Sequence, residues 1–225
     1  MEILKNIHQV PGVMANSYLL VEPDGLTLID SGLPGSAKRI LQYVEDLGRS
    51  PRDLQRILIT HADMDHVGGL GALRKATGAR VFSSAVESRA MAEGRSSRSV
   101  KTGGNSARRI LFSLLGRFFS SKPGPADELL TDGQRLPFAG GLQVLETVGH
   151  TPGHLSFYSP GIGVLFTGDS IIADEKGLQG SRPMYTWDPV KAAEAVRRQA
   201  ALGARIVCPG HGPVVRDAEG KFPSG

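Results

Sequence analysis

The most informative segment of this 225-residue chain reads Thr60-His61-Ala62-Asp63-Met64-Asp65-His66-Val67-Gly68-Gly69. It follows Ile57-Leu58-Ile59, an apolar run with the length of a buried strand. Four metal-competent side chains (His61, Asp63, Asp65 and His66) fall within six residues. Carboxylates and imidazoles packed this closely are costly unless a cation compensates them. The segment therefore predicts a metal site, and the alternative for it taken alone is a solvated, helix-capping acidic turn.

Three further polar residues follow apolar runs elsewhere in the chain. His150 lies in Gly149-His150-Thr151-Pro152-Gly153-His154, Asp169 ends Phe166-Thr167-Gly168-Asp169, and His211 lies in Pro209-Gly210-His211-Gly212. Loop residues that follow strands gather on one edge of a sheet and commonly carry function. These positions predict that all the ligand candidates meet at one sheet edge.

The remaining chain predicts strands and helices in two batches around a central insertion. A hairpin is expected from 18–21 and 26–30 around Pro23-Asp24-Gly25, because the turn separates two apolar runs. Sheets covered by helices on their outer faces are the natural architecture for this order. We expect further strands at 56–60, 80–83, 142–148, 155–158, 164–167 and 205–208, and helices at 35–48, 68–77 and 189–203.

Composition limits the class of protein. With 40% hydrophobic and 21% charged residues, the chain can bury one substantial core. We find no apolar run long enough to cross a membrane, no apolar N-terminal segment of signal-peptide length, and a single cysteine, Cys208. These features predict a cytoplasmic protein without a disulfide framework.

The net charge of +4 is concentrated in one segment. Residues 89–122 contain eight basic residues and one acidic residue, a charge of +7, whereas the rest of the chain carries −3. Within this segment 94–107 reads as a loop, and Ile110, Leu111, Leu114, Leu115 and Phe118 form the apolar stripe of a helix. The segment is either a lid whose arginines attract an anionic substrate or a helix packed on the core. A surface for nucleic acid or a membrane is the weaker alternative, because no pattern of such a module accompanies it.

The ordered set His61-x-Asp63-x-Asp65-His66, His150, Asp169 and His211 resembles the metallo-β-lactamase-fold hydrolases. Leu28-Ile29-Asp30-Ser31-Gly32 and Asp132-Gly133-Gln134-Arg135-Leu136 resemble further landmarks of the family, so the resemblance covers nearly the whole chain. It implies one α/β domain over residues 1–225, a four-layer αββα sandwich with an insertion or lid at about 89–125. It also implies a site for two divalent metal ions at one sheet edge, and a glyoxalase II-like or general hydrolase activity.

The resemblance assigns a role to each candidate ligand. His61 and His150 would bind the first metal; Asp65, His66 and His211 the second; Asp169 would bridge both. The family's usual pattern is His-x-His-x-Asp-His, and here Asp63 replaces the second histidine. We keep Asp63 as a ligand. Zinc is the expected metal, and the harder carboxylate brings in iron or manganese as alternatives.

Four other residues receive more modest interpretations. His154, four residues after His150, is expected to donate to a ligand or to play a structural part, and Cys208 is expected to be buried packing. Asp30 is expected to order the metal-site loops by hydrogen bonds, with a turn-capping Asp-Ser-Gly as the alternative. His8 stands alone and carries no functional prediction.

The expected chemistry is hydrolysis of an ester, thioester, lactone or related small substrate by a metal-activated water, with Asp65 as catalytic proton carrier. Only 14 residues follow His211, so the C-terminal helical domain of glyoxalase II-type enzymes is not expected. Ile172 stands where lactonases of this fold usually carry a tyrosine, for which Tyr185 is a spatial candidate. A mononuclear iron dioxygenase acting on a thiol-derived substrate, a phosphodiesterase and a non-catalytic metal-binding module remain alternatives, and a homodimer stays open.

Overall fold

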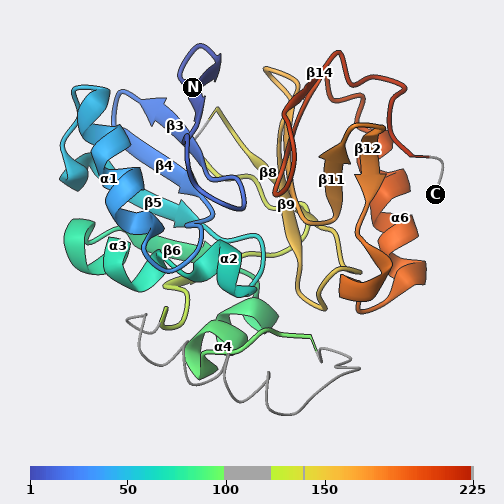
Figure 1. Ribbon diagram of the computed structural model, residues 1–225, viewed down its shortest axis with the longest axis horizontal. Helices are drawn as coiled ribbons and strands as arrows, with labels where there is room; N and C mark the ends of the chain where they lie inside the picture. The colour runs from blue at the N-terminus through green and yellow to red at the C-terminus, as the bar shows by residue number, and fades with distance from the viewer. Residues whose placement is uncertain (99–122, 139, 224–225) are drawn as a thin grey trace.

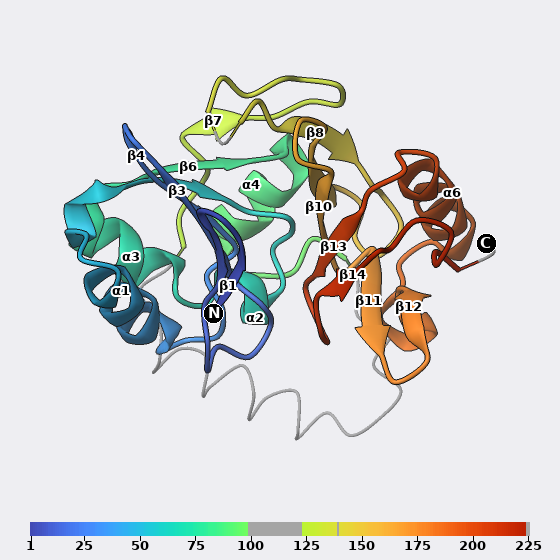
Figure 2. The same cartoon turned by 90° about the horizontal axis from the view of Figure 1, so that it is seen from above.

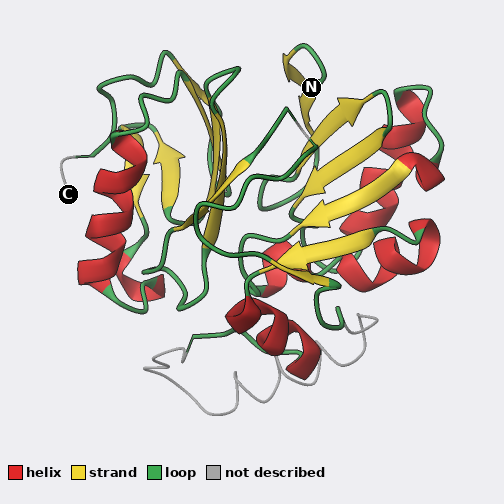
Figure 3. Cartoon of the chain, turned by 180° about the vertical axis from the view of Figure 1, so that it is seen from behind, coloured by secondary structure: helices red, strands yellow, loops and turns green. Residues whose placement is uncertain are grey.

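Two β-sheets pack face to face, and helices cover their outer faces (Figures 1 and 3). The structure is a computed structural model that describes residues 1–98, 123–138 and 140–223. The first sheet runs in the order β1 (Glu2–Leu4), β2 (Ile7–Gln9), β3 (Tyr18–Glu22), β4 (Gly25–Ile29), β5 (Leu54–Leu58), β6 (Arg80–Ser83) and β7 (Glu128–Leu129). The second runs β14 (Val215–Arg216), β13 (Ile206–Pro209), β10 (Val164–Gly168), β9 (Leu155–Ser159) and β8 (Gln143–Glu146). The predicted αββα sandwich is confirmed.

Alternating apolar residues hold the layers together. In β4, Ile29 faces the second sheet and joins Phe157 and Phe166 in a core between the sheets. Its neighbour Leu28 belongs instead to the core under the helices. Successive strand side chains point to opposite faces, so both faces of this strand are buried and all five of its residues are inaccessible.

The outer helices follow from their apolar stripes and caps. α1 (Ser36–Asp46) and α3 (Leu70–Thr77) cover the first sheet, and α6 (Pro189–Ala200) covers the second (Figure 2). Asp188 caps α6 by accepting hydrogen bonds from the N–H groups of Val190 and Lys191. Pro189 suits the first helical position, whose N–H would lack an intrahelical partner in any case.

Strand direction determines where the functional loops lie. β4, β5 and β6 are parallel to one another, and β10 is parallel to β13. The loops that leave the carboxyl ends of β4 and β5 carry Asp30 and His61, and those that leave β10 and β13 carry Asp169 and His211. Neighbouring parallel strands end at the same edge, so both sheets deliver their polar loops to the same region of the molecule.

The structure adds elements that the sequence pattern did not predict. α2 (Met64–Val67) begins inside the motif, α4 (Ala85–Glu93) follows β6, and β11 (Ile171–Asp174) pairs with β12 (Gly177–Gly180) beside the second sheet. Two 3₁₀ turns, η1 (Pro51–Asp53) and η2 (Pro183–Tyr185), complete the described elements. α4 was missed because two of its four buried residues, Glu87 and Ser88, are polar, so no apolar stripe announces it. The predicted helix with its stripe at 110–118 lies outside the described residues, as does most of the lid segment.

None of the helices in the described part of the chain has the length and apolarity needed to span a membrane.

Candidate metal centre

The motif loop is held by a chain of hydrogen bonds that orients its histidines. The Thr60 hydroxyl donates to Asp30 Oδ2 at 2.7 Å, so its oxygen is left to accept from His61 Nδ1 at 3.0 Å. Asp30 Oδ2 also lies 2.8 Å from His66 Nδ1. When Nδ1 carries the proton, the Nε2 atom of each ring is the one free to bind a metal. The predicted role of Asp30 in ordering the loop is confirmed.

The seven predicted ligand residues come together in three overlapping groups. Within each group the ligand atoms lie no more than 4.8 Å apart. The groups are His61, Asp63 and His150; His61, His66 and Asp169; and Asp65, His66 and His211. Their function as metal ligands stays a prediction, but their convergence at one edge is as the sequence predicted.

Asp169 lies between the groups. Its Oδ2 is 3.6 Å from His150 Nε2 and 3.4 Å from His211 Nε2, and its Oδ1 is 3.3 Å from His66 Nε2. Gly210 makes this approach feasible, since a Cβ atom there would lie 2.3 Å from Asp169 Oδ1. The carboxylate therefore faces histidines from both sheets, the position that a bridging ligand requires.

Several atoms at this centre are buried and lack a hydrogen-bond partner. They are His61 Nε2, His66 Nε2 and Asp169 Oδ1. Buried polar atoms are nearly always satisfied, and leaving one unpaired costs about 1–3 kcal/mol. Nitrogen and carboxylate donors aimed at a common point are the ligands of zinc, iron and manganese. The residues present thus fit a divalent metal centre.

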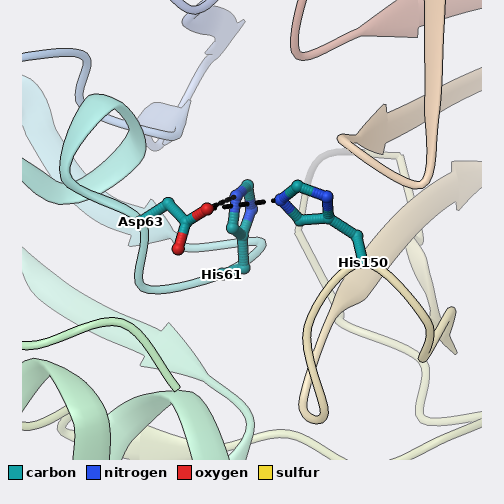
Figure 4. Close-up of side chains that lie close together, drawn as sticks. All are labelled: His61, Asp63 and His150. Carbon is teal, nitrogen blue, oxygen red and sulfur yellow. Dashed lines mark hydrogen bonds and ion pairs between the residues drawn. The ribbon is translucent and has the colours of Figure 1, made fainter. Parts of the chain in front are cut away.

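Asp63 lies close to both histidines of its group and to a third partner that the sequence did not reveal. Its Oδ2 lies 3.7 Å from His61 Nε2 and 3.3 Å from His150 Nε2, and Figure 4 shows the two rings approaching the carboxylate from different loops. The same oxygen accepts from the Arg98 guanidinium, with Nε at 3.2 Å, and Oδ1 accepts from Ser96 at 2.5 Å. The extra negative charge that Asp63 brings is therefore balanced by an arginine from the basic segment.

Arg98 also connects two parts of the pocket wall. Its Nη1 donates to the Tyr185 carbonyl at 2.8 Å, and its guanidinium lies 5.6 Å from the Tyr185 ring centroid. The sequence predicts that the arginines of this segment either attract an anionic substrate from a lid or lie in solvent beside a helix packed on the core. Arg98 is instead an internal counter-ion of the site.

Charge interactions shift the pKa values of the centre strongly. Complete burial opposes protonation of His66, yet the charges of Asp169 and Asp30 raise its pKa well above the usual value. Hydrogen bonds to Asp169 and Asp65 raise the pKa of His211 to about 9. Burial would raise the pKa of Asp63, but contacts with His150, His61 and Arg98 hold it well below its usual range. A cation entering the centre would take the place of protons on His66 and His211, so metal binding there would release protons.

His154 supports the centre without joining it. Its ring is fully buried, Nδ1 lies 2.9 Å from Thr147 Oγ1, and Nε2 accepts the Asp169 backbone N–H at 3.1 Å. Burial lowers the pKa of His154 to about 3, so the ring is neutral and can accept that bond. Of the two roles expected of His154, the structural one is therefore confirmed: the ring accepts a hydrogen bond from the Asp169 backbone rather than donating to a ligand side chain. Cys208 is buried, as expected, and burial raises the pKa of its thiol.

A cavity of about 310 Å³ opens over the centre. Five of the ligand candidates line it, together with five other residues: Asp63, Asp65, His150, Asp169 and His211, and Arg98, Ile172, Ser181, Arg182 and Tyr185. Ser181 also holds His150, with its Oγ 2.8 Å from Nδ1. Neither Ser181 nor Arg182 stood out in the sequence, because no motif marks them.

Replacing Arg98 by methionine tests whether it balances the charge of Asp63. The variant leaves a buried carboxylate without its counter-charge, so metal-free protein should unfold more easily and cation affinity should rise by about tenfold, since like charge near a cation site opposes binding. A competition titration of Zn²⁺ against a chromophoric chelator measures the affinity. Arg95→Met, which removes an exposed arginine of the same segment, should change neither property. A lower Zn²⁺ affinity in the Arg98 variant would contradict the charge argument.

The fold and the site together define a metalloenzyme of the two-sheet sandwich class. The model of the metallo-beta-lactamase superfamily matches residues 10–211. The chain is 32% identical over 210 residues to the uncharacterized protein YobT of Bacillus subtilis, a match that covers 89% of this chain and 84% of YobT. This chain belongs to the metallo-beta-lactamase superfamily and is a metallohydrolase.

Two further similarities concern chemistry. Hydroxyacylglutathione hydrolase of Cereibacter sphaeroides is 32% identical over 160 residues, which span 70% of this chain but only 48% of that enzyme. The crystal structure of TTHA1623 in a di-iron-bound form superposes with a TM-score of 0.71 at 26% identity and covers 95% of both chains. A protein named as a hydrolase and a structure with bound iron are thus both similar to this chain.

Proposed function

We propose that this protein is a cytoplasmic hydrolase that uses two divalent metal ions to cleave an anionic ester, thioester or lactone. The observation that carries the proposal is the position of Asp169, whose two oxygens face histidines of both sheets at 3.3–3.6 Å. Zinc is the metal we propose first. Iron is supported by the carboxylate at Asp63 and by the di-iron form of the similar TTHA1623.

The proposed reaction needs an activated water and a proton carrier. Metal ions bound here would lower the pKa of a shared water and polarise the scissile carbonyl. Asp65 lines the cavity and is half-buried, with Oδ2 3.2 Å from His211 Nε2. Its carboxylate is placed to take up a proton and deliver it to the leaving group, as general acid–base catalysis requires.

The position of Arg182 supports the proposal that the substrate is anionic. Its side chain lines the cavity and is exposed, and no carboxylate partner is found for it among residues 1–98, 123–138 and 140–223. Arg98, the other arginine of the cavity, is already paired with Asp63. Ile172 and Tyr185 supply apolar surface on the same walls, which suits a small acyl group beside a charged end.

Metal analysis followed by a substrate panel tests the proposal. Protein purified without added metal is supplemented with Zn²⁺, Mn²⁺ or Fe²⁺, and we expect two ions per chain. The panel holds esters, thioesters, lactones and phosphodiesters, each as a neutral and an anionic member with the same scissile bond. Binding of one ion per chain or fewer after supplementation would contradict the binuclear site. A single bound iron with oxygen consumption would indicate the dioxygenase instead.

A substitution of Arg182 tests the proposed preference for an anionic substrate. Arg182→Met should raise KM for the anionic substrate by about tenfold, equal to about 1.4 kcal/mol, and leave KM for the neutral one unchanged. Arg197→Met removes an exposed arginine of α6 that does not line the cavity and should change neither. Equal effects on both substrates would remove Arg182 from substrate recognition.

A further inference from the structure

Glu87 of α4 is a fully buried carboxylate that belongs to none of the sequence motifs described above. No cation pairs with it in the described part of the chain, but it accepts four hydrogen bonds from neutral donors. Oε2 accepts from the Ala62 N–H at 2.9 Å. Oε1 accepts from Thr151 Oγ1 and Ser97 Oγ, each at 2.7 Å, and from the Gly153 N–H at 3.0 Å.

The four donors come from three segments that each carry part of the metal centre. Ala62 lies between His61 and Asp63, and Thr151 directly follows His150. Ser97 lies between Ser96 and Arg98, the two residues that bind the Asp63 carboxylate. Each member of the first ligand group, His61, Asp63 and His150, is therefore next in sequence to a residue that donates a hydrogen bond to Glu87.

The packing of α4 against the second loop shows that this contact is built in. A Cβ atom at position 153 would lie 2.6 Å from Ser84 Oγ, 2.6 Å from Val86 Cβ and 2.9 Å from Glu87 Oε1. Gly153 thus allows the helix to approach closely enough for Glu87 to reach both loops. Ser84 in turn caps α4 by accepting the Glu87 N–H at 3.2 Å, which sets the first turn of the helix.

We infer that Glu87 is a positioning residue that sets the geometry of the His61, Asp63 and His150 group. The inference rests on the proposed metal function of that group. His61 and Asp63 come from the first sheet and His150 from the second, so the separation of these loops decides whether three ligand atoms can reach one ion. A carboxylate between the loops holds that separation, because its two oxygens can accept all four donors at once.

Glu87→Gln removes the ability of the side chain to accept all four hydrogen bonds, with little change in its shape. An amide has one oxygen, and the three donors at Oε1 favour keeping it there, which turns the NH₂ group toward the Ala62 N–H. Two donors then face each other, so the turn between His61 and Asp63 must move. The second group, Asp65, His66 and His211, has no contact with Glu87 among the contacts described above.

Titration with Co²⁺, followed by its visible absorption, tests the inference on the full chain. Asp65→Ala removes a ligand candidate that is not part of the group of His61, Asp63 and His150. The step of Co²⁺ binding that remains in this variant is therefore assigned to that group. In Glu87→Gln we expect that step to weaken by about 10- to 100-fold, with the other step unchanged. Glu93→Gln, an exposed glutamate of the same helix, should titrate like the wild type. Thr151→Val removes one of the four donors and should weaken the same step to a smaller degree, which covers the case of a Glu87 variant that does not fold.

The outcomes separate this inference from the proposed function. Unchanged Co²⁺ steps in Glu87→Gln, or equal weakening of both steps, overturn the positioning role even where the wild type hydrolyses its substrate. If the wild type binds one ion and Glu87→Gln weakens the binding of that ion, the positioning role is supported and the binuclear site is contradicted. A wild type that binds no ion overturns both.

Discussion

Replacing Asp169 by alanine is expected to abolish hydrolysis. The carboxylate approaches His66, His150 and His211 at 3.3–3.6 Å, so its removal would take away the residue that we expect both metal ions to share. A loss of at least about 10³-fold in kcat/KM is expected, equal to about 4 kcal/mol of transition-state stabilisation. Steady-state kinetics on the best substrate of the panel, after metal supplementation, measures the loss.

The fold should survive this change. Asp169 lies at the edge of the sandwich, outside the apolar clusters, and its backbone N–H keeps its bond to His154. Circular dichroism and the denaturation midpoint should stay close to those of the wild type. Asp174→Ala, at the exposed end of β11, is the matched control for activity. Normal turnover in Asp169→Ala would remove the bridging assignment.

Asp30→Asn should weaken metal binding by the group of Asp65, His66 and His211, because it changes which nitrogen of His66 carries the proton. The Asp30 carboxylate accepts from Thr60 N and Thr60 Oγ1 and contacts His66 Nδ1. An asparagine that keeps its oxygen toward Thr60 N presents its NH₂ group to His66 Nδ1. The proton of the neutral ring then moves to Nε2, which can no longer bind a metal. Metal affinity of that group should fall by about 10- to 100-fold.

Asparagine is the informative replacement because Asp30 has a left-handed backbone, with φ of 57°, that asparagine tolerates well. The lost hydrogen bonds should lower the free energy of unfolding by about 1–3 kcal/mol. NMR of the imidazole nitrogens reports the tautomer of His66, and a Zn²⁺ competition titration reports the affinity. Asp217→Asn is the control, since Asp217 is exposed and has φ of 50°. An unchanged tautomer would mean that Asp30 does not orient His66.

Strand ends made the centre predictable. His61, Asp169 and His211 each follow an apolar run, and the parallel pairing of β4 with β5 and of β10 with β13 brings those ends to one edge. The hairpin of β3 and β4 and the capped helix α6 were equally predictable, because a turn and an N-cap are local signals. Each of these predictions needed only short-range sequence information.

The partners of the centre were not predictable in this way. Glu87 lies 25 residues from Ala62, 64 from Thr151 and 66 from Gly153, and Arg98 lies 35 residues from Asp63. No local pattern marks either side chain, and the helix that carries Glu87 buries polar residues. Arg98 was counted only as part of a positive segment.

The sequence by itself determined the candidate ligands, most of the strands and helices and the edge where the polar loops meet, because periodicity and strand-end position are properties of neighbouring residues. Only the tertiary structure decided that Arg98 pairs with Asp63 and that Glu87 accepts hydrogen bonds from both ligand loops. These contacts join residues from separate layers of the sandwich. Their energies come from burial and charge, which exist only once the two sheets have packed together.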